Sequence, residues 1–140
     1  MTIPRVGYWF TTTLVAIAFL LPGVGNLVHT PQIAHDMAHL GYPSYFLTVL
    51  GSWKILGAIA ITIPRFPRLK EWAYAGMIFD LTGAAISRAV SGDGIAGIAP
   101  PLAIAALVTA SWALRPRSRR LDLHEPAELR SAAESQVAGA

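Results

Sequence analysis

The sequence predicts an all-α protein, a four-helix transmembrane bundle with both termini in the cytoplasm. Of the 140 residues, 54% are hydrophobic and only 14% are charged, and the mean hydropathy is +0.48. A soluble domain carries about a quarter charged residues. The charges are also clustered, since residues 7–35 and 95–113 contain no Asp, Glu, Lys or Arg. Finally, the basic residues fall in alternate loops. This pattern argues against a cytosolic enzyme.

Four apolar stretches are long enough to cross a hydrocarbon core of about 30 Å, which takes about 20 helical residues. They are residues 8–28, 45–63, 72–90 and 95–114. The connection after the first stretch is the longest, and within it residues 32–40 have room for a helical turn or two. Residues 64–71 form a tight basic turn. Residues 91–94 are so few that the helices on either side must be antiparallel neighbours.

The distribution of Lys and Arg predicts the orientation of the bundle. Arg5 precedes the first helix, three basic residues lie in 64–71 and four directly follow Leu114, whereas 29–44 and 91–94 have none. Basic loops stay in the cytoplasm, so both termini should lie there. A cleaved signal peptide at residues 1–30 is an alternative, but its apolar run is too long, and cleavage would leave the basic tail outside.

Residues 1–114 therefore form the predicted transmembrane domain, and residues 115–140 form a basic, then polar, cytoplasmic tail that we expect to be disordered. The net charge is +3 and the pI is about 9.7, and most of the surplus basic residues lie beside apolar segments. They indicate topology and do not indicate a nucleic-acid partner. The chain has no cysteine, so it forms no disulfide and offers no thiolate to a metal.

Two charged residues lie where hydrocarbon is expected. Lys54 is ten residues before Pro64 and Asp80 is eight after Trp72, which puts both backbones roughly 12 to 15 Å above the same boundary at 1.5 Å per residue. Each charge costs at least about 2.5 kcal/mol at mid-membrane, so pairing is the simplest compensation. Side chains lean toward the N-terminus of their helix, so on antiparallel helices a direct contact needs a bent lysine or a water.

Two interpretations of Lys54 and Asp80 stay open. In the first, they form a buried structural ion pair that fixes which helices pack together. In the second, they handle a proton or a ligand inside a polar cavity. Small residues around both positions allow close approach of the two helices. They are Gly51, Gly57 and Ala58 on one helix and Ala73, Gly76, Gly83, Ala84 and Ser87 on the other.

A second polar group lies near the predicted outer boundary. Asn26 and His29 end the first helix, and Arg88 lies near the end of the third, where Asp36 or Asp93 can pair with it. Together with Lys54 and Asp80, they are the candidate ligand-binding or core polar residues. A metal site at His35 and His39, or a haem site at His29, is the weaker interpretation, so we expect no metal.

The prolines inside two helices add a structural expectation. Pro22 interrupts the first helix and Pro100 and Pro101 interrupt the fourth, so both helices should bend. Bent helices can open a cavity between them, although a simple packing kink is the alternative.

Several motifs in residues 40–93 support a family assignment. They are LGYP before the 45–63 helix, G-x-W-K-x-L-G-A within it, PRxPRLKEWAYAG after it and FDLTGAA in the next helix. This stretch, about two fifths of the chain, resembles the DoxX-like family of small bacterial membrane proteins. The resemblance implies a four-helix bundle in the inner membrane with Lys54 and Asp80 as its polar core. At Arg88 many relatives are expected to carry a histidine.

The resemblance also bears on function, because the family is named after a subunit associated with quinone-linked sulfur oxidation. The leading hypothesis is an accessory or partner subunit in the inner membrane, working with a redox complex or as a homo-oligomer. The alternative is a redox enzyme or subunit that binds a quinone-like ligand between the bent helices and Lys54. A solute or proton pathway is the weakest hypothesis, because few polar residues lie below Lys54 and Asp80. No cofactor motif decides whether the chain is an enzyme.

Overall fold

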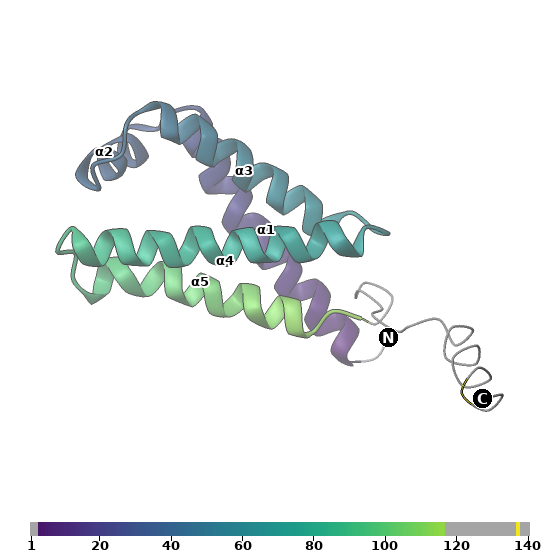
Figure 1. Cartoon of the computed structure of the whole chain (residues 1–140). Coiled ribbons are helices and arrows are strands. Elements are labelled where there is room, and N and C mark those ends of the chain that lie inside the picture. The colour runs from purple at the N-terminus through teal and green to yellow at the C-terminus, as the bar shows by residue number, and fades with distance from the viewer. Residues whose placement is uncertain (1–2, 117–136, 138–140) are drawn as a thin grey trace.

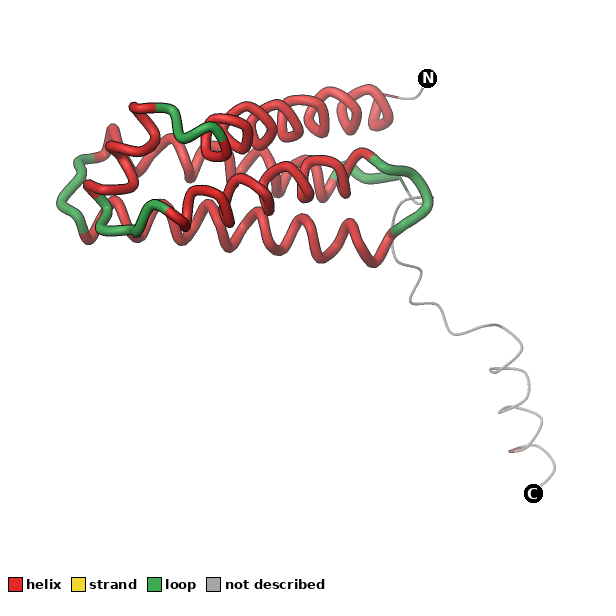
Figure 2. The backbone as a smooth tube through the Cα atoms, turned by 90° about the horizontal axis from the view of Figure 1, so that it is seen from above, coloured by secondary structure: helices red, strands yellow, loops and turns green. Residues whose placement is uncertain are grey.

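The computed structural model describes residues 3–116 and 137, and the structured part of this range is helical without strands. The helices are α1 (Ile3–Leu27), α2 (Pro31–His39), α3 (Tyr45–Thr62), α4 (Pro67–Val90) and α5 (Ile95–Ala113). Figure 2 shows that the loops between them gather at the two ends of the molecule. Most of the predicted tail, residues 117–136 and 138–140, lies outside the described residues.

The helical fold class is confirmed. The described chain has five helices, where the sequence predicted four long ones and room for a helical turn or two at residues 32–40. The additional helix is α2, which is nine residues long and has Pro31 in its first turn. Proline suits this position because the N–H group that it lacks would have no acceptor within the helix. For the same reason α4 begins at Pro67, five residues earlier than expected. The predicted basic turn is correspondingly shorter.

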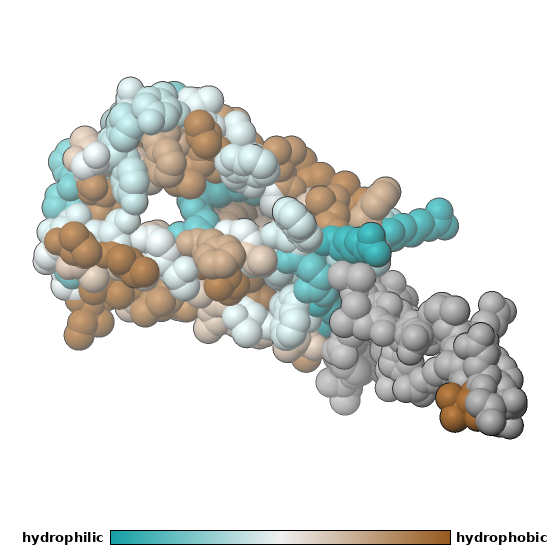
Figure 3. All heavy atoms as spheres, in the orientation of Figure 1, coloured by the Kyte–Doolittle hydropathy of each residue, from teal (hydrophilic) through white to brown (hydrophobic). Residues whose placement is uncertain are grey.

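Three of the described helices are long and apolar enough to cross a membrane: α1, α3 and α5. The fourth long helix, α4, falls short on composition, because it carries five charged residues: Arg68, Lys70, Glu71, Asp80 and Arg88. Large apolar side chains face outward, and Figure 3 shows hydrophobic residues over much of the surface. Such a surface suits lipid and not water, so the chain is a membrane protein.

Helix α1 is central, since it packs against α3 and against α5, while α4 packs mainly against α5. The core is made of apolar side chains from these four helices. It includes Val15, Phe19, Ala58, Ile61, Tyr74, Met77, Leu81 and Val108. Figure 1 shows that α3 and α4 come close at their connecting loop and diverge toward α2.

Glycines explain why α3 leans on α1 and not on α4. A Cβ at Gly51 would lie 2.7 Å from the carbonyl oxygen of Gly23 and 3.0 Å from Cβ of Asn26, so only glycine allows this approach. On α4, in contrast, a Cβ at Gly76 or Gly83 would meet nothing within 4 Å. The small residues of α4 therefore leave open space beside α3, and the expected close approach does not occur there.

Buried polar contacts join the helices at the end of the bundle that carries the α3–α4 loop, which we call the inner end. The Lys70 ammonium group is fully buried and donates to the carbonyl oxygens of Ala60 and Ile61 at the end of α3. Ser111 Oγ lies 2.9 Å from both Thr12 Oγ1 and Tyr74 Oη. These contacts join α1, α3, α4 and α5 at one level, because unsatisfied polar groups are costly inside a core.

Candidate functional site

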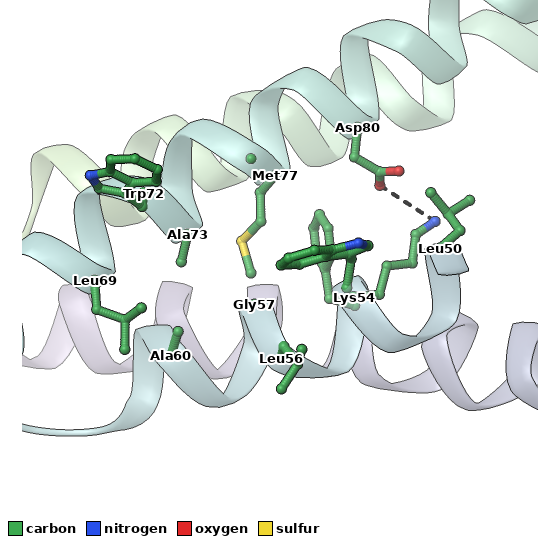
Figure 4. Close-up of a pocket in the computed structure, with 13 residues that line it drawn as sticks. Leu50, Lys54, Leu56, Gly57, Ala60, Leu69, Trp72, Ala73, Met77 and Asp80 are labelled. Carbon is green, nitrogen blue, oxygen red and sulfur yellow. Dashed lines mark ion pairs between the residues drawn. The ribbon is translucent and has the colours of Figure 1, made fainter. Parts of the chain in front are cut away.

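Lys54 on α3 and Asp80 on α4 meet across the gap between their helices. Lys54 Nζ lies 3.4 Å from Asp80 Oδ2, and the side chains are 18% and 19% exposed. Figure 4 shows Lys54 reaching toward the carboxylate, so the contact is direct. Because a fifth of each side chain remains accessible, the pair lies at the wall of open space and not inside the packed core.

On one side of this pair lies a groove between α3 and α4, with a volume of about 440 Å³. Its lining is apolar and aromatic apart from the ion pair. The lining residues include Leu50, Trp53, Leu56, Gly57, Ala60, Leu69, Trp72, Ala73, Gly76 and Met77. Figure 4 shows Leu69 and Trp72 at the end of the groove opposite Asp80. The groove is thus elongated, with charge at one end only.

The groove is open to the outside of the bundle. Trp53 is 69% exposed and Trp72 is 82% exposed, although both line it. The apolar wall suits a hydrocarbon ring or chain, and the ion pair can donate a hydrogen bond from Lys54 or accept one at Asp80. Chemically, this arrangement fits a lipophilic molecule with a polar head.

On the other side of the pair lies a second cavity of about 360 Å³, which we call the outer cavity. All the helices contribute to it, and it is covered by Ile33 and Met37 of α2 and by Leu40, which follows α2. Lys54 and Asp80 line its inner end, while Asp36 and Arg88 line its outer end. This cavity lies between the proline-bearing helices and Lys54, the region where the sequence suggested a ligand.

At the rim of the outer cavity, Arg88 holds two carboxylates. Its guanidinium group donates to Asp93 at 3.0 Å and to Asp36 at 3.3 Å, and His39 Nε2 lies 2.8 Å from Asp93 Oδ1. The hydrogen bond with His39, together with that from Arg88, holds the pKa of Asp93 below its usual value. These contacts tie α2 to the outer ends of α4 and α5.

The profile of the DoxX-like family matches residues 10–111, which run from α1 into α5 and include the ion pair, the groove and the outer cavity. The chain belongs to the DoxX-like family. The resemblance seen in the sequence is therefore confirmed, and the family region extends well beyond the motifs that suggested it. No curated protein and no solved structure matches the chain.

Within this DoxX-like domain, the structure brings together some of the candidate residues and not others. Lys54, Asp80, Arg88 and Asn26 all line the outer cavity. His29 does not, because α1 ends at Leu27 and the ring turns back to the carbonyl oxygen of that residue, at 3.2 Å, on the exposed surface. The left-handed backbone at His29, with φ of 51°, produces this turn.

The two histidines of α2 lie in different surroundings. The His35 side chain is 81% exposed, whereas His39 is engaged with Asp93. No group of three His, Cys, Asp or Glu side chains able to hold a metal occurs among the described residues.

Two basic residues, Lys70 inside the DoxX-like match and Arg115 just after it, have structural roles that charge counting missed. By sequence both were counted only as basic residues between or after the helices, but they are 0% and 3% exposed. The Arg115 guanidinium group donates to Glu71 at 2.6 Å and lies over the rings of Tyr74 and Trp112. The aromatic residues and Glu71 near the predicted boundary were the available signal, since arginine stacks on aromatic rings and pairs with carboxylates.

Proposed function

We propose that the protein is a multi-pass protein of the bacterial inner membrane with four spans and cytoplasmic termini. In this proposal it acts as an accessory subunit that binds a quinone-like lipophilic ligand in the groove between α3 and α4. The single observation that carries the ligand proposal is the shape of that groove, an apolar slot with the Lys54–Asp80 pair at one end and tryptophans at its walls.

The fourth span in this proposal is α4. Its 24 residues are long enough, and its charge at mid-depth is compensated, because Asp80 pairs with Lys54. The orientation follows from the basic residues of the 63–66 loop and of the chain after α5. Reporter fusions test it. A fusion after Arg120 should be active only as a cytoplasmic reporter, and one near Gln32 only as a periplasmic reporter; the reverse pattern would overturn the orientation.

The groove favours an occupant that arrives from the bilayer. Its open side carries Trp53 and Trp72, and amphipathic rings of this kind lie readily at the edge of lipid. A quinone ring is flat and apolar with carbonyl oxygens at its edge. The Lys54 ammonium group can donate to one of these oxygens at the end of the groove while the ring lies against the apolar wall.

The test uses the tryptophans of the groove as reporters. A ubiquinone with a single isoprene unit, added to the purified protein in lipid nanodiscs, should quench tryptophan fluorescence in a saturable manner. Gly76→Leu fills the groove and should weaken this quenching at least about tenfold, because a leucine side chain takes the volume the ring would use. Gly83→Leu is the matched control, since a Cβ at either glycine meets nothing within 4 Å and only Gly76 lines the groove. Equal binding by both variants would overturn the proposal.

A purely structural accessory subunit is the second candidate function. It is favoured by the loose packing of α3 on α4. The Lys54–Asp80 ion pair would then serve to join the two helices across the gap between them. Co-purification from native membranes, with analysis of bound lipids and associated chains, separates the two. If the protein co-purifies with a redox complex but with no bound quinone, the result favours this second function. Turnover of a quinone by the purified chain alone would contradict both accessory roles.

A further inference from the structure

The prolines of two helices converge on the outer cavity. Pro22, Pro100 and Pro101 all line it. Proline has no N–H, so the carbonyl group four residues earlier loses its normal helical donor. The three residues that carry these carbonyl groups also line the cavity: Ala18, Ala96 and Gly97. The wall of the outer cavity therefore presents backbone acceptors as well as side chains.

A buried amide lies in the same wall. Asn26 is 2% exposed, it lines the outer cavity, and its Nδ2 atom has no hydrogen-bond partner among the described residues. A buried amide donor left without a partner costs about 1 to 3 kcal/mol, so such groups are normally satisfied by protein or by ordered water. Asn26 thus provides a donor where the proline-bearing helices provide acceptors.

The volume is large enough for water. At about 360 Å³, the outer cavity has room for on the order of ten water molecules of about 30 Å³ each. Figure 3 shows an opening between α3 and α4 next to α2, with hydrophilic side chains at its edge. Polar partners, space and an opening are together the conditions under which a cavity is hydrated.

On the side that faces the α3–α4 loop, the outer cavity ends at the ion pair. Its outer end reaches Asp36 and Arg88, whose side chains are 38% and 28% exposed. On the inner side of the ion pair lies the apolar core, in which Val15, Ile61 and Val108 are completely buried. A path from the outer surface can therefore reach Lys54 and Asp80 but ends there.

We propose that the outer cavity is a one-sided aqueous channel that brings water, and with it protons, from the outer surface to the Lys54–Asp80 pair. The pair then faces water on one side and the apolar groove on the other. The inference rests on the proposed topology, but it does not depend on what occupies the groove. Asn26 and the carbonyl groups released by proline hold the water in place.

The chain has no cysteine, which makes single-cysteine labelling of the full-length protein direct. Ala18→Cys and Ala84→Cys place a thiol at the outer cavity. Ala103→Cys is the lipid-facing control, since Ala103 is exposed in the middle of α5 and lines none of the cavities described above. His35→Cys is the outer aqueous control. Each variant is treated, in right-side-out vesicles, with a trimethylammonium methanethiosulfonate, which does not cross membranes.

We expect the cavity cysteines to react at least about tenfold faster than the cysteine at position 103, because only a hydrated thiol ionises to the reactive thiolate. If the cysteine at position 35 reacts and the cavity cysteines do not, the channel is absent. If the cysteine at position 35 reacts only in inside-out vesicles, the topology is wrong and the proposal falls with it. Quinone quenching is measured separately, so failure of the channel and failure of the groove ligand are distinguished.

A second variant tests the role of the amide. Asn26→Leu has a similar shape but no polar group, and in the Ala84→Cys background it should slow labelling at least about threefold, because fewer waters are held. The helical circular dichroism of this variant, compared with the parent, reports whether the fold is kept. Unchanged labelling in a folded variant would overturn the role assigned to Asn26.

Discussion

Lys54 Nζ and Asp80 Oδ2 lie 3.4 Å apart, and the two residues line both the α3–α4 groove and the outer cavity. With Phe19, these two residues are the ones that line the α3–α4 groove and the outer cavity alike. The ion pair thus forms the polar part of the wall between the apolar α3–α4 groove and the outer cavity. A change at either residue alters both sides.

A double-mutant cycle measures how strongly the two residues depend on one another. Lys54→Met or Asp80→Asn alone should lower the free energy of unfolding by about 1 to 3 kcal/mol, because each leaves a charge without its partner at a site that is only about a fifth exposed. The double variant should lose less than the sum of the two. Thermal unfolding in detergent measures this coupling, and additive losses would show that the two side chains depend on different partners.

The hydroxyl cluster at the inner end should contribute to stability. Ser111→Ala removes the oxygen shared by Thr12 and Tyr74, so two buried hydroxyl groups lose a partner, and we expect a loss of about 1 to 3 kcal/mol. Thr109→Ala is the control, because Thr109 is exposed and its hydroxyl only donates to the carbonyl oxygen of Ala105 in its own helix. Chemical denaturation of both variants should separate them; equal losses would contradict the role of the cluster.

Lys70 should act as a cap for α3. Lys70→Met keeps the length of the side chain but removes the donors to the carbonyl oxygens of Ala60 and Ile61. We expect a loss of about 1.5 to 3 kcal/mol, the usual range for hydrogen bonds from a charged group. Arg68→Met removes an exposed charge from the same turn and should change stability by less than about 0.5 kcal/mol. Thermal unfolding of the two variants checks this, and an equally large loss in the Arg68 variant would indicate an effect of net charge.

Attachment of α2 should depend on pH through Asp93. Its contacts with His39 and Arg88 lower its pKa from the ordinary value of 3.8, so its carboxylate stabilises the fold above that value. This stabilisation is lost as the pH falls from about 3.8 through the lower pKa of the folded state. The protection of the α2 amides against hydrogen exchange, taken relative to their intrinsic exchange rate at each pH, should therefore fall in acid. In Asp93→Asn the exchange should be fast already at neutral pH, and a wild-type-like acid response in that variant would assign the effect to another carboxylate.

Much of the candidate site could be predicted by counting along the chain. The rise of 1.5 Å per residue gave Lys54 and Asp80 similar depths, and the structure has them in contact. Whether they serve a ligand remains a proposal. His29 could not be placed in this way, because a single left-handed residue after α1 turns its ring to the surface. Local backbone conformation of this kind leaves no periodic signal.

The sequence by itself determined the helices, their approximate ends and the family, because apolar length, proline positions and short motifs are local properties of the chain. Only the tertiary structure decided which faces meet. Gly51 packs on Gly23 of α1, so α3 leans away from α4 and leaves open space around Gly76. That choice depends on contacts between residues far apart in sequence. The fit of one helix backbone against another, and not the polarity of either helix, determines where open space is left between apolar helices.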